Sequence, residues 1–412
     1  MSSSVVSTPA GAVRQTSLRE INLALLLGRI AAAPRPPSRA DLAADTGLTR
    51  ATVSAVVDDL IGGGLVTEVD PTPRARAGRP ARGLLLAGHG PAGLGLEVNV
   101  DYLAACVLDL AGAVRHRTVR RVDLRLLSPG ETLGLVAELA ARARADADDQ
   151  GLTLAGAALA VPGLVGAGGV VRLAPNLGWR EVDVPALLAT RPPLTEAVPG
   201  LPALVVDNEA NLAALGELHA GRAGVTDFLY ISGEVGIGAG IVLDGTLYRG
   251  GRGWSGEIGH LPVHPEGRPC RCGGRGCLEQ YAGQEAIIGA AGLGGDDLPA
   301  HAARLHRLAD EGDPATLAAL AEAGTALGVA VAGVVNLLDL DTVVLGGGYA
   351  PLARWLSPPV TAEVSRRVLT AAWAPVTIRP AVLGADAAAV GAAGSVVRRI
   401  IARPHAWLAR CG

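Results

Sequence analysis

One short, cysteine-rich segment constrains this chain more than any other. Three of its five cysteines, Cys270, Cys272 and Cys277, follow His260 in the pattern His-x9-Cys-x-Cys-x4-Cys. Glycines between the thiols let so short a loop fold around a small ion. Three thiolates and one imidazole complete a tetrahedral set with no open position, so we expect a structural zinc (Zn2+) site in a loop at 260–279. The alternative is a set of reduced surface thiols without metal.

Length and composition set the frame around this loop. A chain of 412 residues allows several domains with buried cores, and 49% hydrophobic with 18% charged residues is typical of a folded globular protein. The odd cysteine count and the absence of a signal-peptide pattern predict a reducing, cytoplasmic setting. The long uncharged run 151–171 has Pro162 and several glycines at its centre. We therefore expect a strand and a turn there, and no membrane partner.

Charge is distributed unevenly along the chain. The net charge is −3, but residues 1–90 contain ten Arg and seven acids, a net charge of +3, which leaves −6 for residues 91–412. The first ninety residues are therefore the candidate for a polyanionic partner. Residues 1–16 lack periodicity and are expected to form a disordered tail. A DNA-binding domain is predicted over 17–88 and a larger domain over 89–412.

A helix-turn-helix pattern follows the tail. Apolar residues recur at helical spacing over 18–30, and Ser38 can cap a second helix with Asp41 in the capping-box position. Gly47 supplies a tight turn, after which Thr49 is the expected N-cap of a recognition helix. The exposed N-terminal end of such a helix reaches base edges in the major groove. The DNA contacts predicted on it are Thr49, Arg50, Thr52 and Ser54.

Two short strands, 65–69 and 83–86, are expected to flank a basic wing. The segment 71–82 between them contains no acid, and Gly78-Arg79-Pro80 is narrow enough to enter a minor groove, where Arg is attracted by the negative potential. A solvated basic linker is the alternative. The position directly behind a helix-turn-helix favours DNA contact by the wing arginines Arg74, Arg76, Arg79 and Arg82.

The rest of the chain alternates strand-like runs with helical segments, which is the pattern of an α/β protein. A helix is expected at 133–145 and another from about 210. The strands are expected at 94–100, 103–110, 114–121, 154–161, 204–206 and 228–232.

Several motifs accompany the cysteine loop. They are Gly256-Glu-Ile-Gly-His260 with Cys270-Arg-Cys-Gly-Gly-Arg-Gly-Cys-Leu-Glu279, and Val161-Pro-Gly-Leu-Val165, Ala174-Pro-Asn-Leu-Gly-Trp179, Asp207-Asn-Glu-Ala-Asn211 and Leu345-Gly-Gly-Gly348. Together they span 92–402 and resemble the repressor, open reading frame and kinase (ROK) family, whose repressor branch carries an N-terminal winged helix-turn-helix. The resemblance implies a two-lobed, actin-like sugar-kinase (RNase H-like) fold with a sugar site between the lobes.

The resemblance also implies which residues hold the sugar. In such proteins the hydroxyls contact an Asn-Asp pair, the Glu and His of Glu-x-x-His, and a Glu two residues beyond the last zinc Cys. Carboxylates accept hydrogen bonds from hydroxyls, and an amide both donates and accepts. His260 would bind the metal with one ring nitrogen and face the ligand with the other. Trp179 could stack on a sugar or belong to the core. The implied sugar-site residues here are Asn208, Glu209, Glu257, His260 and Glu279.

Departures from the family's kinase pattern favour a regulator over an enzyme. The first phosphate loop of the kinases, Asp-x-Gly-Gly-Thr, is here Glu97-Val-Asn-Val-Asp101, without either glycine. The second, Gly-Thr-Gly, is Gly233-Glu234-Val235, which puts a carboxylate where a triphosphate would be repelled. Glu209 stands at the position of the catalytic Asp and is one methylene longer.

We therefore expect a sugar-responsive repressor of carbohydrate-utilisation genes that is not an enzyme. Its partners would be double-stranded operator DNA and a small sugar or sugar derivative, and a two-fold operator predicts a homodimer or a dimer of dimers. The alternatives are a ROK-type sugar kinase with an accessory DNA-binding domain, and a metal sensor built on the cysteine loop.

Overall fold

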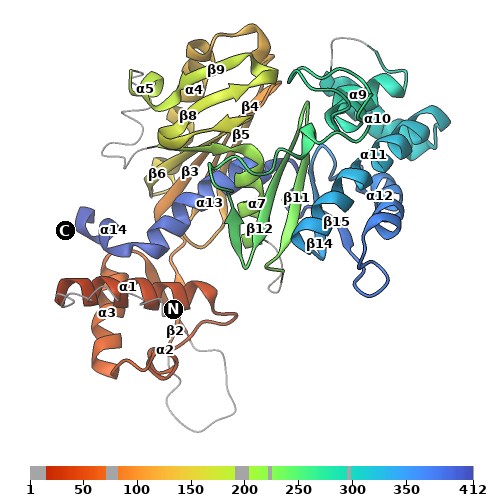
Figure 1. Ribbon diagram of the computed structural model, residues 1–412. Helices are drawn as coiled ribbons and strands as arrows, with labels where there is room; N and C mark the ends of the chain where they lie inside the picture. Colours follow the sequence, from red (N-terminus) through yellow and green to blue (C-terminus); the bar gives the residue numbers. More distant parts are fainter. Residues whose placement is uncertain (1–14, 71–81, 191–203, 221–224, 295–297, 412) are drawn as a thin grey trace, which may run out of the picture.

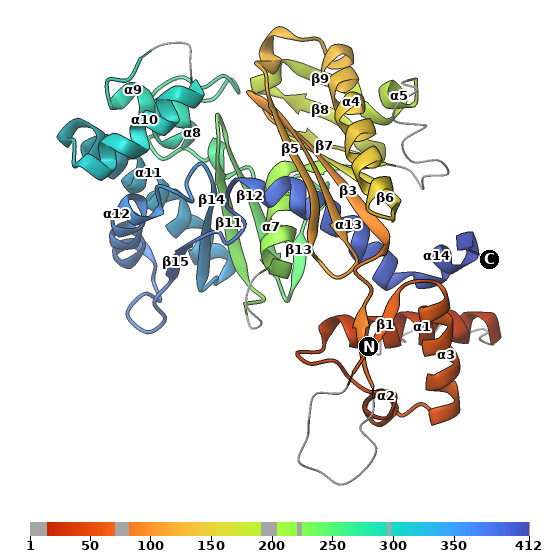
Figure 2. The ribbon, with the colours of Figure 1, turned by 180° about the vertical axis from the view of Figure 1, so that it is seen from behind.

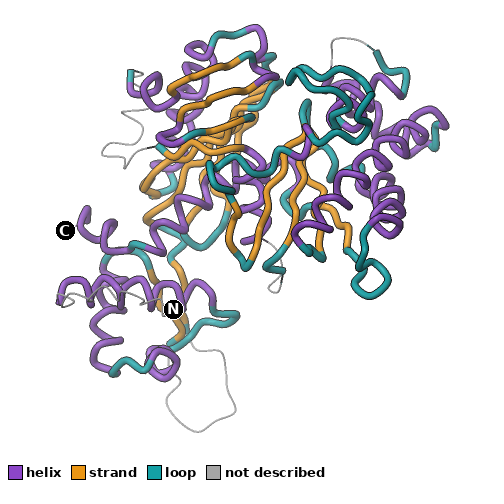
Figure 3. Tube along the Cα trace, viewed as in Figure 1, coloured by secondary structure: helices purple, strands orange, loops and turns teal. Residues whose placement is uncertain are grey.

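A computed structural model describes residues 15–70, 82–190, 204–220, 225–294 and 298–411 of the chain. These residues form a small N-terminal domain and two larger lobes that each contain a β-sheet (Figure 1). Figure 3 shows that the N-terminal domain is mainly helical, whereas strands and helices are mixed in both lobes.

The N-terminal domain is the predicted winged helix-turn-helix. Ser38 caps the second helix: its hydroxyl accepts from the Asp41 N–H group at 3.2 Å, and the Asp41 carboxylate accepts from the Ser38 N–H group at 2.9 Å. Gly47 ends that helix at φ +72°, a left-handed conformation that favours glycine, and Thr49 caps the third. The two strands pair antiparallel. The elements are α1 (Gln15–Ala32), α2 (Arg39–Thr46), α3 (Arg50–Gly62), β1 (Val66–Val69) and β2 (Gly83–Leu86).

The N-terminal lobe contains a mixed sheet in the order β10-β6-β3-β4-β5 and a smaller antiparallel sheet in the order β7-β8-β9. Helix α4 (Pro129–Asp149) packs against the large sheet, and α5 (Val184–Ala189) lies beside the small one. The strands are β3 (Gly90–Val98), β4 (Tyr102–Asp109), β5 (Val114–Arg121), β6 (Leu152–Val161), β7 (Leu164–Val165), β8 (Val170–Ala174), β9 (Trp179–Asp183) and β10 (Val205–Asn208).

The C-terminal lobe contains a sheet in the order β13-β12-β11-β14-β15. Its strands are β11 (Phe228–Gly233), β12 (Ile237–Leu243), β13 (Thr246–Tyr248), β14 (Thr342–Gly347) and β15 (Thr377–Pro380). Its own helices are α8 (Glu279–Ala282), α9 (Gln284–Ala290), α10 (Leu298–Glu311), α11 (Pro314–Leu338) and α12 (Ala353–Arg367). Among the described helices α11 has the length and apolarity of a membrane span, but 61% of that window is buried inside the lobe. The first part of the run 151–171 folds into β6 and a turn, as predicted, and the rest forms β7, a short 3-10 helix and the start of β8.

Two helices, α7 (Glu209–Ala220) and α13 (Ala387–Ala402), lie between the two large sheets (Figures 1 and 2). Glycines bring their backbones close: a Cβ at Gly391 of α13 would collide with the Leu212 carbonyl of α7, and one at Gly95 of β3 with the Ala389 carbonyl. Successive side chains of β11 point to opposite faces of its sheet, and both faces are buried. Phe228 and Tyr230 belong to the core with α7 and α13, and Leu229 and Ile231 to the core with α11 and α12.

The chain's C-terminal helix, α14 (Pro404–Cys411), joins the lobes to the N-terminal domain. Its Trp407 is 8% exposed, and the indole N–H group donates to the Gly63 carbonyl at 2.9 Å. Leu408 lies directly against Gly63. The apolar core of the N-terminal domain therefore continues onto α13, α14 and β4. Figure 2 shows α14 beside the N-terminal domain.

Candidate ligand cleft and metal centre

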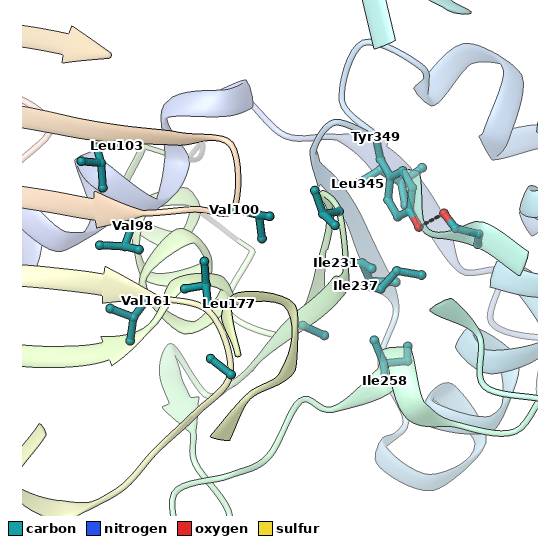
Figure 4. Close-up of a cluster of buried hydrophobic side chains, with 14 of the residues drawn as sticks. Val98, Val100, Leu103, Val161, Leu177, Ile231, Ile237, Ile258, Leu345 and Tyr349 are labelled. Atoms are coloured by element: carbon teal, nitrogen blue, oxygen red, sulfur yellow. Dashed lines mark hydrogen bonds between the residues drawn. The ribbon is translucent and has the colours of Figure 1, made fainter. Parts of the chain in front are cut away.

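A cavity of about 200 Å³ lies between the two lobes. It is closed by residues from both, including Asn99, Pro162 and Asn176 of the N-terminal lobe and Ser232 and Gly238 of the C-terminal lobe. Figure 4 shows the apolar side chains around this region, with Val100 and Leu177 on one side and Ile237 and Ile258 on the other. We call this the first cavity.

All five residues implied by the family resemblance line the first cavity. Each stands at the end of an element, where a side chain can reach into the cleft. One ends β10, one begins α7, one precedes the short helix Ile258–His260, one ends that helix, and one begins α8. Their role as ligand contacts stays a prediction. In that order the residues are Asn208, Glu209, Glu257, His260 and Glu279.

Asn208 orients the carboxylate next to it. Its amide nitrogen lies 2.8 Å from Glu209 Oε2 and 3.1 Å from the Gly163 carbonyl, while its Oδ1 accepts from the N–H groups of the first turn of α7. Burial holds the pKa of Glu209 well above its usual range, and the nearby charges of Glu257 and Glu97 add to the effect. Burial in the cleft therefore favours the protonated form of the Glu209 carboxyl group.

Asn176 is a cavity residue to which the sequence analysis assigned no role, although it lies in the quoted segment 174–179. A Cβ at Gly236 would lie 2.7 Å from both Asn176 Nδ2 and Glu279 Oε2. Glycine at this position thus lets the amide from one lobe approach the carboxylate from the other. The Ile237 N–H group donates to Glu279 Oε2 at 3.3 Å, which holds that carboxylate toward the cavity.

The loop 260–279, which we call the metal loop, brings its four predicted ligands together. One ligand atom from each of His260, Cys270, Cys272 and Cys277 lies within 4.8 Å of all the others. The sulfurs of Cys272 and Cys277 are 3.7 Å apart, and Cys270 Sγ is 3.9 Å from His260 Nδ1. These separations match the edges of a tetrahedron with metal–ligand bonds of about 2.0–2.3 Å. The four residues could therefore hold a metal ion.

The backbone of the loop fits this arrangement as well. Gly276 has φ +67°, and a Cβ there would collide with the His264 carbonyl, so the loop needs glycine at this position. The Gly274 N–H group donates to Cys272 Sγ at 3.4 Å, and the Gln280 amide donates to Cys270 Sγ at 3.5 Å. Such donors stabilise thiolates. Because His260 Nδ1 faces the cysteines, Nε2 is left for the first cavity.

Two contacts that the sequence analysis missed tie the lobes together beside the cavity. Arg249, just after β13, forms a two-pronged pair with Asp207 of β10, with N–O distances of 3.0 and 2.6 Å. The Trp254 indole donates to the Val165 carbonyl of β7 at 3.1 Å. Both contacts lie on the segment that leads to Glu257. They join residues 42 and 89 positions apart, so no local pattern signals them.

Acidic side chains lie at the ends of β3 and β11, in the two segments that the family resemblance compares with the phosphate loops of the kinases. Glu234 lies against Gly347 and is hydrogen-bonded by the backbone of Gly348. Burial, together with the charges of Glu97 and Asp101, raises the pKa of Glu234 to about 8. Burial also raises the pKa of Glu97 to about 7.

The predicted DNA-contacting residues of α3 lie at its exposed end. Thr49 and Arg50 are exposed, whereas Thr52 and Ser54 are half-buried. In the wing, Arg82 is exposed and pairs with Glu68 at 3.0 Å, which partly neutralises it. The predicted contacts Arg74, Arg76 and Arg79 lie outside the described residues.

Of the two interpretations of Trp179, the structure supports the core. Trp179 is 2% exposed and packs with the apolar core of the N-terminal lobe, and it does not line the first cavity. Stacking on a bound sugar ring is therefore excluded for this side chain in this conformation.

Comparisons with known proteins agree with this architecture. A xylose repressor of Bacillus subtilis (strain 168) is 30% identical over 386 residues, covering 93% of this chain and 96% of the relative. A glucokinase of Halalkalibacterium halodurans is 34% identical over 254 residues, covering 58% of this chain and 74% of the relative. A solved ROK family transcriptional regulator, described as a homolog of the E. coli MLC protein, superposes with a TM-score of 0.75 at 26% identity, covering 95% and 99% of the two chains. The model of the ROK family matches residues 93–399, and the chain belongs to this family.

Proposed function

We propose that this protein is a repressor that binds operator DNA through its winged helix-turn-helix and a sugar in the first cavity. The observation that carries the proposal is a cavity between two lobes that several acidic and amide side chains line, combined with a winged helix-turn-helix whose core continues onto the interlobe helix α13. The similarity to xylose repressors over 93% of the chain supports it.

The cavity offers the chemistry that a sugar needs. The carboxylates of Glu257 and Glu279 and a protonated or ionised Glu209 would accept hydrogen bonds from hydroxyls, and Asn208 would donate and accept. His260 Nε2 would complete the set. Because these residues come from both lobes and from the metal loop, a bound sugar would favour one relative position of the lobes over others.

We propose that the metal is zinc and that its role is structural. Three thiols and one imidazole are the ligand chemistry of closed zinc sites. When bound, zinc would cross-link the four ligands and thereby hold the loop 260–279 in place. The chain's own contribution would be to orient the His260 ring toward the cavity and to place Glu279 immediately behind the last ligand.

DNA binding would use α3 and the wing together. Thr49, Arg50, Thr52 and Ser54 would face the major groove, and the wing arginines would contact phosphates or the minor groove. A homodimer or a dimer of dimers would present two winged helix-turn-helix domains to a two-fold operator. We propose a cytoplasmic location, where such DNA is available.

Phosphoryl transfer is disfavoured by the residues in the phosphate region. A nucleotide needs backbone N–H groups that are free to bind phosphate oxygens. Here the Glu234 carboxylate already accepts from the backbone of Gly348, and Glu97 adds a second acid nearby. Relatives of this chain include glucokinases, so a coupled assay for hexose-dependent ATP turnover decides this point directly.

Two measurements test the proposal. Full-length protein should retard a duplex from the promoter region of its own gene in a gel shift, and D-xylose or D-glucose should alter that retardation.

Calorimetry on Glu257→Gln should show at least about tenfold weaker sugar binding, since one charge-assisted hydrogen bond is worth about 1.5–3 kcal/mol. Its affinity for the duplex without sugar should be unchanged. Glu311→Gln, on the exposed surface of α10, is the matched control. Wild-type sugar binding by Glu257→Gln would remove this residue from the site.

A further inference from the structure

A second cavity, of about 480 Å³, lies next to the first. It is lined by residues of the metal loop, α8 and α9 of the C-terminal lobe and by Asn176 of the N-terminal lobe. Figure 2 shows α8 and α9 side by side. A monosaccharide in the first cavity would not occupy it. Its volume is more than twice that of the first cavity.

The two cavities are neighbours that share part of their walls. Asn176, Arg271 and Glu279 line both of them. Asn176 and Glu279 are the pair that approach each other over Gly236. If a ligand in the first cavity contacts Glu279, a group attached to that end of the ligand would enter the second cavity.

The polar wall of the second cavity carries donors that the fold already holds in place. The Arg268 guanidinium donates to the Gln280 carbonyl at 2.8 Å and lies 4.7 Å from the centre of the Tyr281 ring. Arg271 donates to Glu285 Oε2 at 3.1 Å. A guanidinium has five N–H donors, so each retains donors for a ligand. Fixed donors lose little conformational entropy when they bind.

Small residues form another part of the lining. Ala286, Gly289 and Ala290 lie on α9 and Gly283 immediately before it, and none has a side chain larger than a methyl group. A Cβ placed at Gly289 would meet no atom within 4 Å, so the space above this helix is open. A surface of this kind accepts the face of a ring.

The charges on the walls select the chemistry of the occupant. The lining contains two guanidinium groups, Arg268 and Arg271, and two carboxylates, Glu279 and Glu285. Outside the lining, Glu322 lies 3.6 Å from Arg268, and Arg125 of the other lobe lies 3.5 Å from Glu285. Balanced charges with many donors and acceptors suit a neutral polyhydroxylated group. A phosphate would meet two carboxylates, and an ammonium group would meet two guanidinium groups.

We infer that the second cavity binds a second sugar unit, so that the effector is a disaccharide or longer oligosaccharide whose first ring occupies the first cavity. This inference rests on the proposed function. The first unit contacts the carboxylates near the metal loop, the linkage passes Glu279 and Asn176, and the second unit lies between the two arginines and α9.

Calorimetry on full-length protein tests the inference, with D-xylose, D-glucose, xylobiose, cellobiose, maltose and glucose 6-phosphate as probes. At least one disaccharide should bind at least tenfold more tightly than either monosaccharide. Gly289→Trp fills the second cavity, and it should remove this advantage while monosaccharide affinity stays within twofold of wild type. Gly333→Trp on α11 is the matched control, because this glycine is also helical, exposed and without neighbours within 4 Å. It should bind every probe as wild type does.

Each other result has a definite meaning. Equal binding of monosaccharides and disaccharides, or an unchanged disaccharide affinity in Gly289→Trp, would overturn the inference and leave the proposed function intact. Tightest binding of glucose 6-phosphate would also overturn it, in favour of an anion site at the two arginines. If no sugar of either size bound the wild-type protein, the proposed function would fail, and the inference with it.

Discussion

Glu97 makes the stability of the N-terminal lobe depend on pH, and replacing it with Gln should abolish that dependence. The side chain is 3% exposed on β3, and its Oε1 accepts from the Tyr102 hydroxyl at 2.7 Å. Burial is the largest cause that raises the pKa of Glu97 from 4.5 to about 7, and the charge of Asp386 adds to it. Hydrogen bonds from Tyr102, Asn99 and the Ala389 backbone lower the pKa of Glu97, but they do not offset the effect of burial.

The sign and size of the effect follow from proton linkage. A carboxyl whose pKa is raised in the folded state releases its proton on unfolding, so the folded state loses stability as pH rises from about 4.5 to about 7. With those two pKa values the cost is about 1.4 kcal/mol at pH 5.5 and about 3.4 kcal/mol at pH 8.5. Glu97→Gln has no proton to lose. Its free energy of unfolding relative to wild type should therefore increase by about 2 kcal/mol between these pH values.

Urea unfolding followed by circular dichroism and tryptophan fluorescence at pH 5.5 and pH 8.5 measures this difference. Glu311→Gln, an exposed acid on α10, is the control and should give the same difference from wild type at both pH values. A difference between Glu97→Gln and wild type that changed by less than about 0.5 kcal/mol would refute the reasoning. It would mean that water or a cation reaches the carboxylate and keeps it ionised at low cost.

Three further results are expected. Cys272→Ser should lower the bound zinc, measured by atomic absorption, and should weaken sugar binding while leaving the retardation of operator DNA intact; zinc content equal to wild type would contradict the ligand assignment. Arg79→Ala should weaken operator binding and reduce the slope of log affinity against log salt by about 1, whereas an unchanged slope would place this residue away from phosphate. Trp407→Ala should cost about 3 kcal/mol of stability and make the segment between β2 and β3 more susceptible to protease, and wild-type cleavage rates would show that α14 does not anchor the N-terminal domain.

The parts of the molecule that the sequence predicts well are those specified by neighbours along the chain. The capping box of Ser38 and Asp41, the left-handed Gly47 and the N-cap Thr49 all act within a few residues, and the structure contains each of them. The metal loop is likewise confined to a short stretch, so its spacing alone places four ligand atoms together.

The parts that could not be predicted depend on how distant segments pack. Arg249 and Asp207 meet because β13 and β10 are edge strands of different sheets, and neither strand pattern indicates the other. The second cavity exists only when the metal loop, α9 and Asn176 come together. Trp179 shows the converse problem: a large aromatic residue inside a quoted motif was compatible with two roles, and only its 2% exposure decides for the core.

We expect α13 to transmit an effect of a bound sugar to the N-terminal domain, because this helix contacts β3, α7 and α1. It packs on β3 at Gly95, on α7 at Gly391, and through α14 on Gly63 of the N-terminal domain. Glu209, the first residue of α7, is itself a wall of the first cavity. At the glycine contacts the backbones approach too closely to slide past one another freely, so a closure of the lobes that moves α7 must carry α13 with it or repack the contact as a unit. Either event changes the position of α14 against the helix-turn-helix. We expect a sugar in the first cavity to reorient the helix-turn-helix by this route, although Glu209 lies more than 140 residues from α3 in the sequence.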